Sequence, residues 1–252
     1  MGSLTVGTSF AKALALALQI PLVGVHHMKA HILAHLIDDA SDNKPEFPFL
    51  CLTVSGGHTQ IVQVNAPLDM QVLGSTIDDA AGEAYDKAAK MLGLPYPGGP
   101  LIDQHAQLGN PTAFQFAKPQ IPELNFSFSG LKTSILYTLQ AAEKQDPDFR
   151  KNHLNDLCAS IQNSIVSILL HKLDKAVQQT GIKTVAIAGG VSANSELRKR
   201  LLEKESKGWQ VSIPKMSYCT DNAAMIAMAG SFYLADGQTV DQTIVADPRL
   251  KW

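Results

Sequence analysis

The stretch KTVAIAGGVSANSELRKRLLEKESKGWQVSIP, residues 183–214, decides the fold class. It predicts an apolar strand over 183–188, a turn at Gly189-Gly190, a helix from about Ala193 to Lys204, and a second strand over 209–214. A further helix is expected from Asn222 to Ala235. Strands that alternate with helices are typical of α/β proteins. We therefore expect the second half of the chain to be α/β.

The middle of the chain has a different pattern of strands. The runs FPFLCLTV (47–54), HTQIVQV (58–64) and MQVLGSTI (70–77) are β-rich and predict a hairpin or meander. Because this hairpin precedes the alternating part, the domain is predicted to be mixed α/β and not all-parallel. The segments that follow are predicted as helices at 80–92, 129–144 and 149–180, a Gly/Pro-rich loop at 94–100 and an irregular segment at 109–128.

The front of the chain predicts two helices. The first ends at Pro21 and leads into a short strand, LVGVHH (22–27), and the second spans HHMKAHILAHLIDDA (26–40). Residues 42–48 are polar, contain proline and are interpreted as a linker.

The composition of the 252 residues, 45% hydrophobic and 17% charged, indicates a globular protein. The formal net charge of -2 gives no whole-chain basic character, so any nucleic-acid partner must be held by a local patch or by helper proteins. One basic stretch is compatible with either a solvated face or a phosphate contact: Arg198, Lys199, Arg200, Lys204 and Lys207.

The cysteines and the apolar front segment bear on the location of the protein. Cys51, Cys158 and Cys219 lack metal-knuckle spacing and are interpreted as reduced packing residues of a cytosolic protein. The most apolar segment, residues 4–25, is interrupted by polar residues and proline, so we expect no targeting or spanning segment.

His27 and His31 are four residues apart and would share one helical face, where two imidazoles can bind one metal ion. Ordinary packing or capping is equally compatible with this pair. His26 is expected to end the strand and His35 to cover solvent. Met28 stands where a zinc protease of the H-E-x-x-H type needs glutamate, which disfavours a peptidase.

Asp221, in YCTDNAAMIAMAG, is a possible third metal ligand, although the N-cap of the following helix is the simpler role. Two histidines and one carboxylate suit ferrous iron and also zinc.

Two glycine turns follow apolar strands and could bring backbone N–H groups close to a phosphate. The first, in TVSGGHT (53–59), is equally compatible with a plain hairpin turn. The second, in AIAGGVSAN, is followed by Asn194, whose amide could bond a sugar or a base. Near the loop at 94–100, Glu83 and Asp86 could accept ribose hydroxyls, although with Asp79 they could equally form a solvated face. Ser129 and Lys132 are interpreted as a helix cap and a surface cation.

Six segments, taken in order, resemble the TsaD family of tRNA N6-adenosine threonylcarbamoyltransferases, formerly classed as O-sialoglycoprotein endopeptidases. The segments extend from the first residues to about Ala229: VHHMKAH, VSGGHTQ, IDDAAGEAYDKAAKMLGLPYPGGP, FSFSGLKTS, AGGVSAN and CTDNAAMIA. The resemblance implies the α/β fold of actin, Hsp70 and sugar kinases (the ASKHA fold), with two related domains around a nucleotide cleft. Residues 1–46, completed by 219–252, would be the remainder of the first domain, and 47–218 the second.

The resemblance also implies an activity. The chain would transfer the threonylcarbamoyl group from threonylcarbamoyl-AMP to N6 of adenosine 37 in tRNAs that read codons beginning with A. A TsaB-like paralogue and a TsaE-like ATPase are the implied protein partners, and the location is cytoplasmic.

The residues that match the family's sites are of two kinds. His27, His31 and Asp221 would bind one divalent metal ion, with Fe²⁺ favoured and Zn²⁺ or Mg²⁺ as alternatives. The implied substrate-binding residues are Thr53, Val54, Ser55, Gly56, Gly57, Asp86, Gly99, Asp103 and Asn194.

The first strands of the family have no counterpart here, so the chain is interpreted as truncated at its N-terminus, with an incomplete first domain. Two alternative functions stay open: an inactive relative that acts as a binding or dimerisation partner, and another carbamoyl- or phosphotransferase of the same fold.

Overall fold

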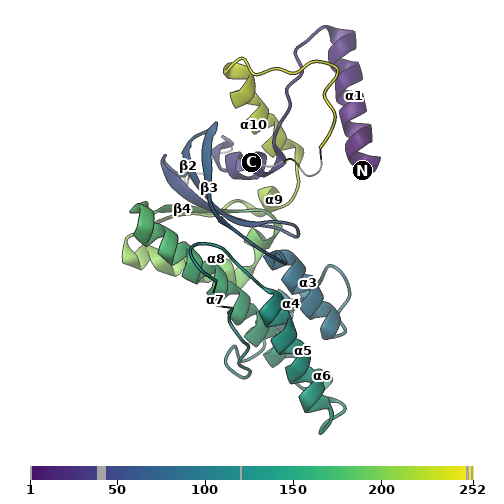
Figure 1. Cartoon of the computed structure of the whole chain (residues 1–252), viewed down its shortest axis with the longest axis vertical. Helices are drawn as coiled ribbons and strands as arrows, with labels where there is room; N and C mark the ends of the chain where they lie inside the picture. The colour runs from purple at the N-terminus through teal and green to yellow at the C-terminus, as the bar shows by residue number, and fades with distance from the viewer. Residues whose placement is uncertain (1, 39–43, 120, 248–249, 251) are drawn as a thin grey trace.

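The computed structural model describes residues 2–38, 44–119, 121–247, 250 and 252. Its centre is a five-stranded sheet with the strand order β3-β2-β1-β4-β5 (Figure 1). The predicted meander is confirmed, because β1 pairs with β2 and β2 with β3, all antiparallel. Strands β4 and β5 continue the sheet in parallel with β1. The strands are β1 (Phe49–Val54), β2 (Thr59–Ala66), β3 (Asp69–Ser75), β4 (Thr184–Ala188) and β5 (Gln210–Ser212).

Both faces of the sheet are covered, as the alternation of buried residues along β1 shows. Leu50 and Leu52 belong to a large core on one face, whereas Phe49 and Cys51 belong to a smaller core on the other. Successive side chains of a strand point to opposite faces, so a strand that is apolar throughout needs cover on both. The large core is shared with α3 (Ala81–Met91), α4 (Gly98–Ala106), α5 (Ser129–Glu143), α7 (Leu154–Thr180) and α8 (Ser195–Leu202).

The second face is covered by α2 (His27–Leu33), whose Ile32 joins the smaller core. Helix α2 also packs on α10 (Ala223–Ala235), through Leu33 of α2 and Met225 of α10. Further out lies α1 (Gly2–Leu18), where the Lys12 ammonium donates a hydrogen bond to the Ile244 carbonyl. The front and the end of the chain therefore lie side by side (Figure 1).

The predicted strand at 22–27 is wrong. Leu22 forms only an isolated bridge with Val240, and His26 is the N-cap of α2. The helix predicted over 26–40 is regular only to Leu33 and continues as a 3₁₀ turn over Ala34–Leu36. Its last residues, and the first residues of the predicted linker at 42–48, lie outside the described residues.

Other differences come from short or interrupted helices. Helix α4 begins inside the segment predicted as a loop, where the Asp86 carboxylate accepts a hydrogen bond from the Gly98 N–H at 2.8 Å. The helix predicted over 149–180 is interrupted at His153 between α6 (Phe149–Asn152) and α7. A short helix, α9 (Met216–Cys219), was not predicted. Short 3₁₀ segments, Gly190–Ala193 and Glu203–Lys207, flank α8.

The packing role predicted for the cysteines is confirmed, because Cys51, Cys158 and Cys219 are all buried and not in disulfides. Among the described residues, no helix has both the length and the apolar character needed to cross a membrane.

Candidate functional site

Helix α2 places two histidines on one face. Its N-cap, His26, accepts a hydrogen bond from the Lys29 N–H through Nδ1 at 3.4 Å. One helical turn separates His27 from His31, and their ring centroids lie 4.8 Å apart. The first ring is half exposed and the second is buried. The pair therefore presents one accessible and one enclosed imidazole.

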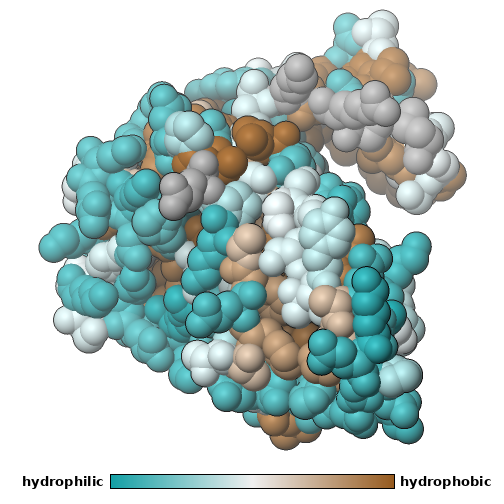
Figure 2. Space-filling view, turned by 60° about the horizontal axis from the view of Figure 1, so that its bottom comes forward, coloured by the Kyte–Doolittle hydropathy of each residue, from teal (hydrophilic) through white to brown (hydrophobic). Residues whose placement is uncertain are grey.

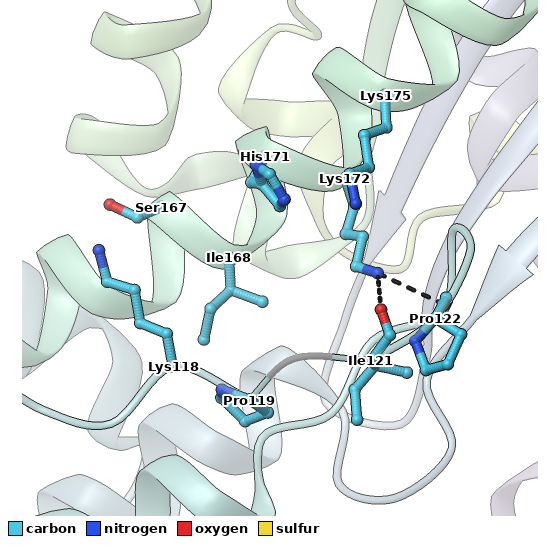
Figure 3. A pocket seen from close by; sticks show the side chains of 9 residues that line it. All are labelled: Lys118, Pro119, Ile121, Pro122, Ser167, Ile168, His171, Lys172 and Lys175. Carbon is cyan, nitrogen blue, oxygen red and sulfur yellow. Dashed lines mark hydrogen bonds between the residues drawn. The ribbon is translucent and has the colours of Figure 1, made fainter.

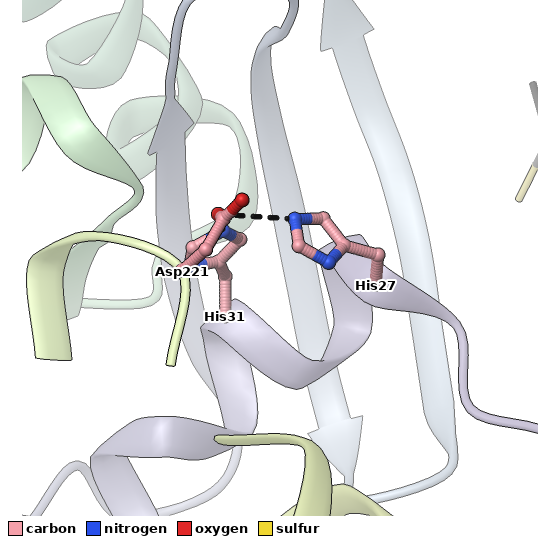
Figure 4. A group of neighbouring side chains, drawn as sticks. All are labelled: His27, His31 and Asp221. Carbon is pink, nitrogen blue, oxygen red and sulfur yellow. Dashed lines mark hydrogen bonds and ion pairs between the residues drawn. The ribbon is translucent and has the colours of Figure 1, made fainter. Parts of the chain in front are cut away.

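Asp221 reaches this pair from the far end of the chain (Figure 4). Its Oδ1 lies 3.3 Å from His27 Nε2 and 3.1 Å from His31 Nε2. The alternative role of Asp221 as a helix cap is excluded, because Asn222 is the N-cap of α10 and accepts a hydrogen bond from the Met225 N–H at 2.8 Å. The Asp221 carboxylate is therefore not used to begin the helix.

These three side chains fit a divalent metal ion. Two imidazole nitrogens and one carboxylate oxygen lie within 4.8 Å of one another. Burial, and then the charge of His27, lower the pKa of His31, which favours the neutral imidazole that a metal needs. Three protein ligands leave further coordination positions for water or substrate, as in catalytic centres.

His58 is a residue of this region that the prediction of site residues missed. It follows the Gly56-Gly57 turn, and its pKa is lowered by burial and then by the charge of His27. The charge of His58 in turn contributes to lowering the pKa of His31. The first glycine turn is thus an electrostatic neighbour of the metal-ligand cluster. The histidine in TVSGGHT is the only sequence signal that could have indicated this.

The turn at Ser55–His58 is closed by two hydrogen bonds. The Ser55 N–H donates to the His58 carbonyl at 2.8 Å, and the His58 N–H donates to Ser55 Oγ at 3.1 Å. Gly56 and Gly57 at its tip are exposed, whereas Thr53 and Val54 are buried in β1. The accessible part of this segment is therefore the turn, with the glycine backbone and His58, and not the side chains of Thr53 and Val54 in the strand.

Two other segments meet this turn. The Gly82 N–H of α3 donates to the Ser55 carbonyl at 3.1 Å, and a Cβ on Gly82 would lie 2.6 Å from that oxygen. Gly189 has a φ of +88°, and a Cβ there would lie 2.5 Å from the Val54 carbonyl oxygen. Since β1 and β4 are parallel neighbours, both glycine turns lie at the same edge of the sheet, where α/β proteins bind their ligands.

The structure links two of the predicted substrate-binding residues, Asp103 and Asn194, through Gln162 of α7. The Gln162 amide donates to Asp103 Oδ1 at 3.1 Å, and the Asn194 amide donates to Gln162 Oε1 at 2.7 Å. Asn194 also caps α8, since its Oδ1 accepts from the Leu197 N–H at 3.0 Å. Asp103 in turn accepts from the Ser195 hydroxyl at 2.6 Å. Sequence reasoning did not find Gln162, which lies within an ordinary helical pattern.

The three acids predicted on one face of α3 separate into two groups. Lys87 binds Asp79 at 2.7 Å and Glu83 at 2.9 Å, whereas Asp86 holds the N-terminus of α4. Of the residues near the predicted loop, Gly99 lies at the start of α4, where its Cβ position would contact Tyr85 at 3.8 Å. Since Glu83 is paired with Lys87, Asp86 and not Glu83 lies beside this helix start.

Two further predictions from single residues are corrected. His35 does not cover solvent: it is buried, with Nε2 2.8 Å from the Ile187 carbonyl oxygen and Nδ1 3.1 Å from Ser212 Oγ. Ser129 is not the helix cap, because the N-cap position of α5 is Phe128, whose N–H donates to Asp78 at 2.8 Å.

Comparison with known proteins first defines the class. The chain has the same α/β fold as two solved HypF proteins, as its likeness to them shows. A full-length HypF in its phosphate- and nucleotide-bound form is 15% identical with a TM-score of 0.61, covering 88% of this chain and 37% of that protein. HypF from T. kodakarensis is 16% identical with a TM-score of 0.61, covering 91% and 39%.

The family follows from the sequence matches. The family model "TsaD: tRNA N6-adenosine threonylcarbamoyltransferase" matches residues 1–228, and the chain belongs to this family. A relative of that name from Christiangramia forsetii is 57% identical over 253 residues, covering 100% of this chain and 74% of the relative. Others come from Riemerella anatipestifer (54% identical, 99% and 73% covered) and Neisseria meningitidis (45% identical, 95% and 72% covered).

Proposed function

We propose that this chain transfers the threonylcarbamoyl group of threonylcarbamoyl-AMP to N6 of adenosine 37 in tRNAs that read codons beginning with A. The observation that carries the proposal is the His27, His31 and Asp221 cluster, which is electrostatically coupled to His58 beside the glycine turn. Family membership over residues 1–228 supports the same activity.

The reaction is an acyl transfer from an activated donor. The N6 amine of adenosine attacks the carbamoyl carbon, a new C–N bond forms, and the bond from that carbon to the phosphate oxygen breaks. AMP leaves with the electron pair, and the amine loses one proton. Since the adenylate is already activated, positioning can supply most of the rate enhancement without a nucleophilic side chain.

The residues of the chain have separate roles in this proposal. The exposed backbone N–H groups of Gly56 and Gly57 bind an anionic part of the adenylate, because no Cβ blocks approach. Asp86, Gly99, Asp103 and Asn194 contact its nucleoside part, and Gln162 holds Asp103 and Asn194 in place.

A metal ion bound by His27, His31 and Asp221 would supply Lewis-acid polarisation of acyl or phosphate oxygens. We propose Fe²⁺ as the ion, because two imidazoles and one carboxylate form the ligand set of many ferrous centres, with Zn²⁺ or Mg²⁺ as alternatives.

The proposal includes protein partners, a TsaB-like paralogue and a TsaE-like ATPase. Helix α1 supports a protein partner, since Val6, Phe10 and Leu16 are each about two-thirds exposed or more. Apolar residues gather on the projecting part of the molecule at the upper right of Figure 2. An exposed apolar patch of this kind is typical of an interaction surface.

We further propose two domains and a cytoplasmic location. The first domain comprises residues 1–46 and 219–252, and the second comprises 47–218. The packing of α2 on α10 supports the first grouping.

The test is to incubate the purified chain and its protein partners with threonylcarbamoyl-AMP and unmodified tRNA, and to measure the modified nucleoside by mass spectrometry. We expect product from the parent chain and a loss of at least tenfold in Asp221→Asn, with Asp236→Asn as a matched control at the other end of α10. No product from the parent, under conditions where a relative is active, would overturn the proposal.

A further inference from the structure

A basic hollow lies on the C-terminal half of α7, away from the residues of the candidate site. It has a volume of about 710 Å³, and its polar lining includes Lys118, His171, Lys172 and Lys175. Figure 3 shows Lys118 and Pro119 across from His171 and Ile168 of α7. The hollow therefore has an apolar wall and a cationic lining.

Lys172 provides a fixed positive charge at this place. The side chain is buried, and its ammonium donates hydrogen bonds to the carbonyls of Ile121 at 2.6 Å and Glu123 at 2.7 Å. Carbonyl oxygens satisfy the donors but carry no full charge to neutralise the ammonium. Among the described residues, no carboxylate lies at ion-pair distance from Lys172, so its charge has no counter-charge there.

The accessible lysines of the hollow are also unpaired. Within the described part of the chain, no carboxylate lies at ion-pair distance from Lys118 or Lys175. The nearby acid Asp174 is already bound, because both of its oxygens lie 2.7 Å from the Lys204 ammonium. The positive charges are therefore available to an anion from outside the chain.

A second hollow extends the first. It has a volume of about 410 Å³, shares His171 and Lys175 with the first hollow, and adds Lys207, Trp209 and Asp174, the acid that Lys204 binds. We call the two together the α7 groove. Lys118 lines the first hollow, Lys207 lines the second and Lys175 lines both, so the lysines are spread along the groove and not gathered at one point. Such a track is typical of binding to a phosphate backbone.

The basic stretch seen in the sequence contributes only Lys207 to this groove. Arg198 donates to the carbonyls of Ser192 at 2.7 Å and Pro214 at 2.8 Å. Arg200 binds Asn163 and Ser167, and Lys204 binds Asp174. Three of these five cations are therefore bound by other groups of the fold.

We propose that the α7 groove binds phosphate groups of the RNA backbone and so holds the tRNA while its target base lies in the candidate site; this inference rests on the proposed function. Gln162 of the candidate site and Lys175 lie on the same helix, 13 residues apart, which corresponds to roughly 20 Å. An RNA stem can reach over this distance when its loop enters the site. Phosphate contacts of this kind fix the register of the RNA and read no sequence.

The test compares two double variants of equal net charge. Lys118→Gln with Lys175→Gln removes cations of the groove, whereas Lys144→Gln with Lys151→Gln removes exposed lysines at the far ends of α5 and α6. Binding of a fluorescein-labelled, unmodified tRNA transcript is measured by anisotropy at several salt concentrations. We expect the groove variant to bind roughly tenfold more weakly and to lose about two from the slope of log affinity against log salt, and the control to match the parent.

Equal affinity and equal salt slope in the two double variants would overturn the groove, as would absence of tRNA binding by the parent chain. Binding of AMP or inorganic phosphate, followed through the His171 ring signals by NMR, would overturn it in favour of a small-anion site if tRNA binding were unchanged in the groove variant. The unfolding midpoint of each variant checks the fold. Since product formation is measured separately, failure of the groove leaves the transferase proposal standing, and failure of the transferase activity leaves the binding result intact.

Discussion

Asp221 Oδ1 lies 3.1 Å from His31 Nε2, although the two residues are 190 positions apart in the chain. The contact depends on the packing of α10 against α2, where Met225 and Ala229 meet Ala30 and Leu33. It also depends on Asn222, which caps α10 and leaves the Asp221 carboxylate outside the cap. The metal-ligand cluster is thus a product of tertiary packing.

Asp221→Asn should weaken metal binding at least tenfold, because an amide oxygen carries no charge to offset that of a divalent ion. The measurement is calorimetric titration of the metal-free chain with Fe²⁺ without oxygen, and with Zn²⁺. Asp236→Asn, at the C-cap of α10, is the control and should bind metal as the parent does. Unchanged affinity in Asp221→Asn would exclude Asp221 as a ligand.

Gly82→Ala should destabilise the chain by about 1–3 kcal/mol, because its Cβ would lie 2.6 Å from the Ser55 carbonyl oxygen and 2.8 Å from Gly56 Cα, both backbone atoms. Urea unfolding measures the free energy difference. Gly7→Ala in α1 is the control, because nothing lies within 4 Å of its Cβ position, and alanine should be neutral or slightly stabilising in a helix. An equally stable Gly82→Ala chain would show that α3 and the turn are free to separate.

Acid should reduce stability through His35. Burial lowers the pKa of His35 from the ordinary value of 6.5 to about 4. Between these values the unfolded chain binds a proton that the folded chain does not, so the free energy of unfolding falls as the pH falls from 6.5 to 4, by at most about 3 kcal/mol. The measurement is urea unfolding of the parent and of His35→Gln at pH 7.0, 5.5 and 4.5.

His35→Gln should show a weaker fall in stability between pH 7.0 and 4.5. His31 and His58 also have lowered pKa values and act in the same direction, so only the difference between the two proteins reports on His35. If the free energy of unfolding of the two proteins fell in parallel, the pKa of His35 would be the same in the folded and the unfolded chain.

Gln162→Leu should destabilise the chain by about 1–3 kcal/mol, because the buried Asn194 amide and Asp103 Oδ1 would each lose a partner. Gln179→Leu, at an exposed position on the same helix and outside the α7 groove, is the matched control and should have little effect. Nucleotide affinity, measured with AMP, should fall in Gln162→Leu only. A change in stability without a change in AMP affinity would make Gln162 a structural residue alone.

The fold class was predictable because strands and helices with one buried face carry a repeating pattern. The apolar run in β1 and the strand-turn-helix unit at β4 identified the two central strands directly. Helix α4 was missed because its first turn is Gly98-Gly99-Pro100, and the Asp86 carboxylate that accepts from its first N–H lies 12 residues earlier. A hydrogen bond to a helix start from a residue 12 positions earlier cannot be predicted from the sequence around the helix.

The site was predictable where residue type and spacing coincide, as for His27 and His31. Asp221 was found as an acid before a helix, but its neighbour Asn222 takes the cap, which spacing could not decide. Gln162 and His58 acquire their roles only from the segments packed against them. The burial of His35 was missed because its hydrogen-bond partners, Ile187 and Ser212, lie on β4 and β5.

The burial of all three cysteines makes the chain suitable for site-specific labelling. Burial raises the pKa of Cys158 to about 12 and that of Cys51 higher still, so neither forms thiolate near neutral pH. Cys219 is fully buried, with its Sγ 3.1 Å from an Arg198 nitrogen. Two cysteines introduced at exposed positions, one on α1 and one on the sheet, would therefore react with maleimide dyes in preference to the native thiols, and energy transfer between a donor and an acceptor dye would follow the distance between the two elements.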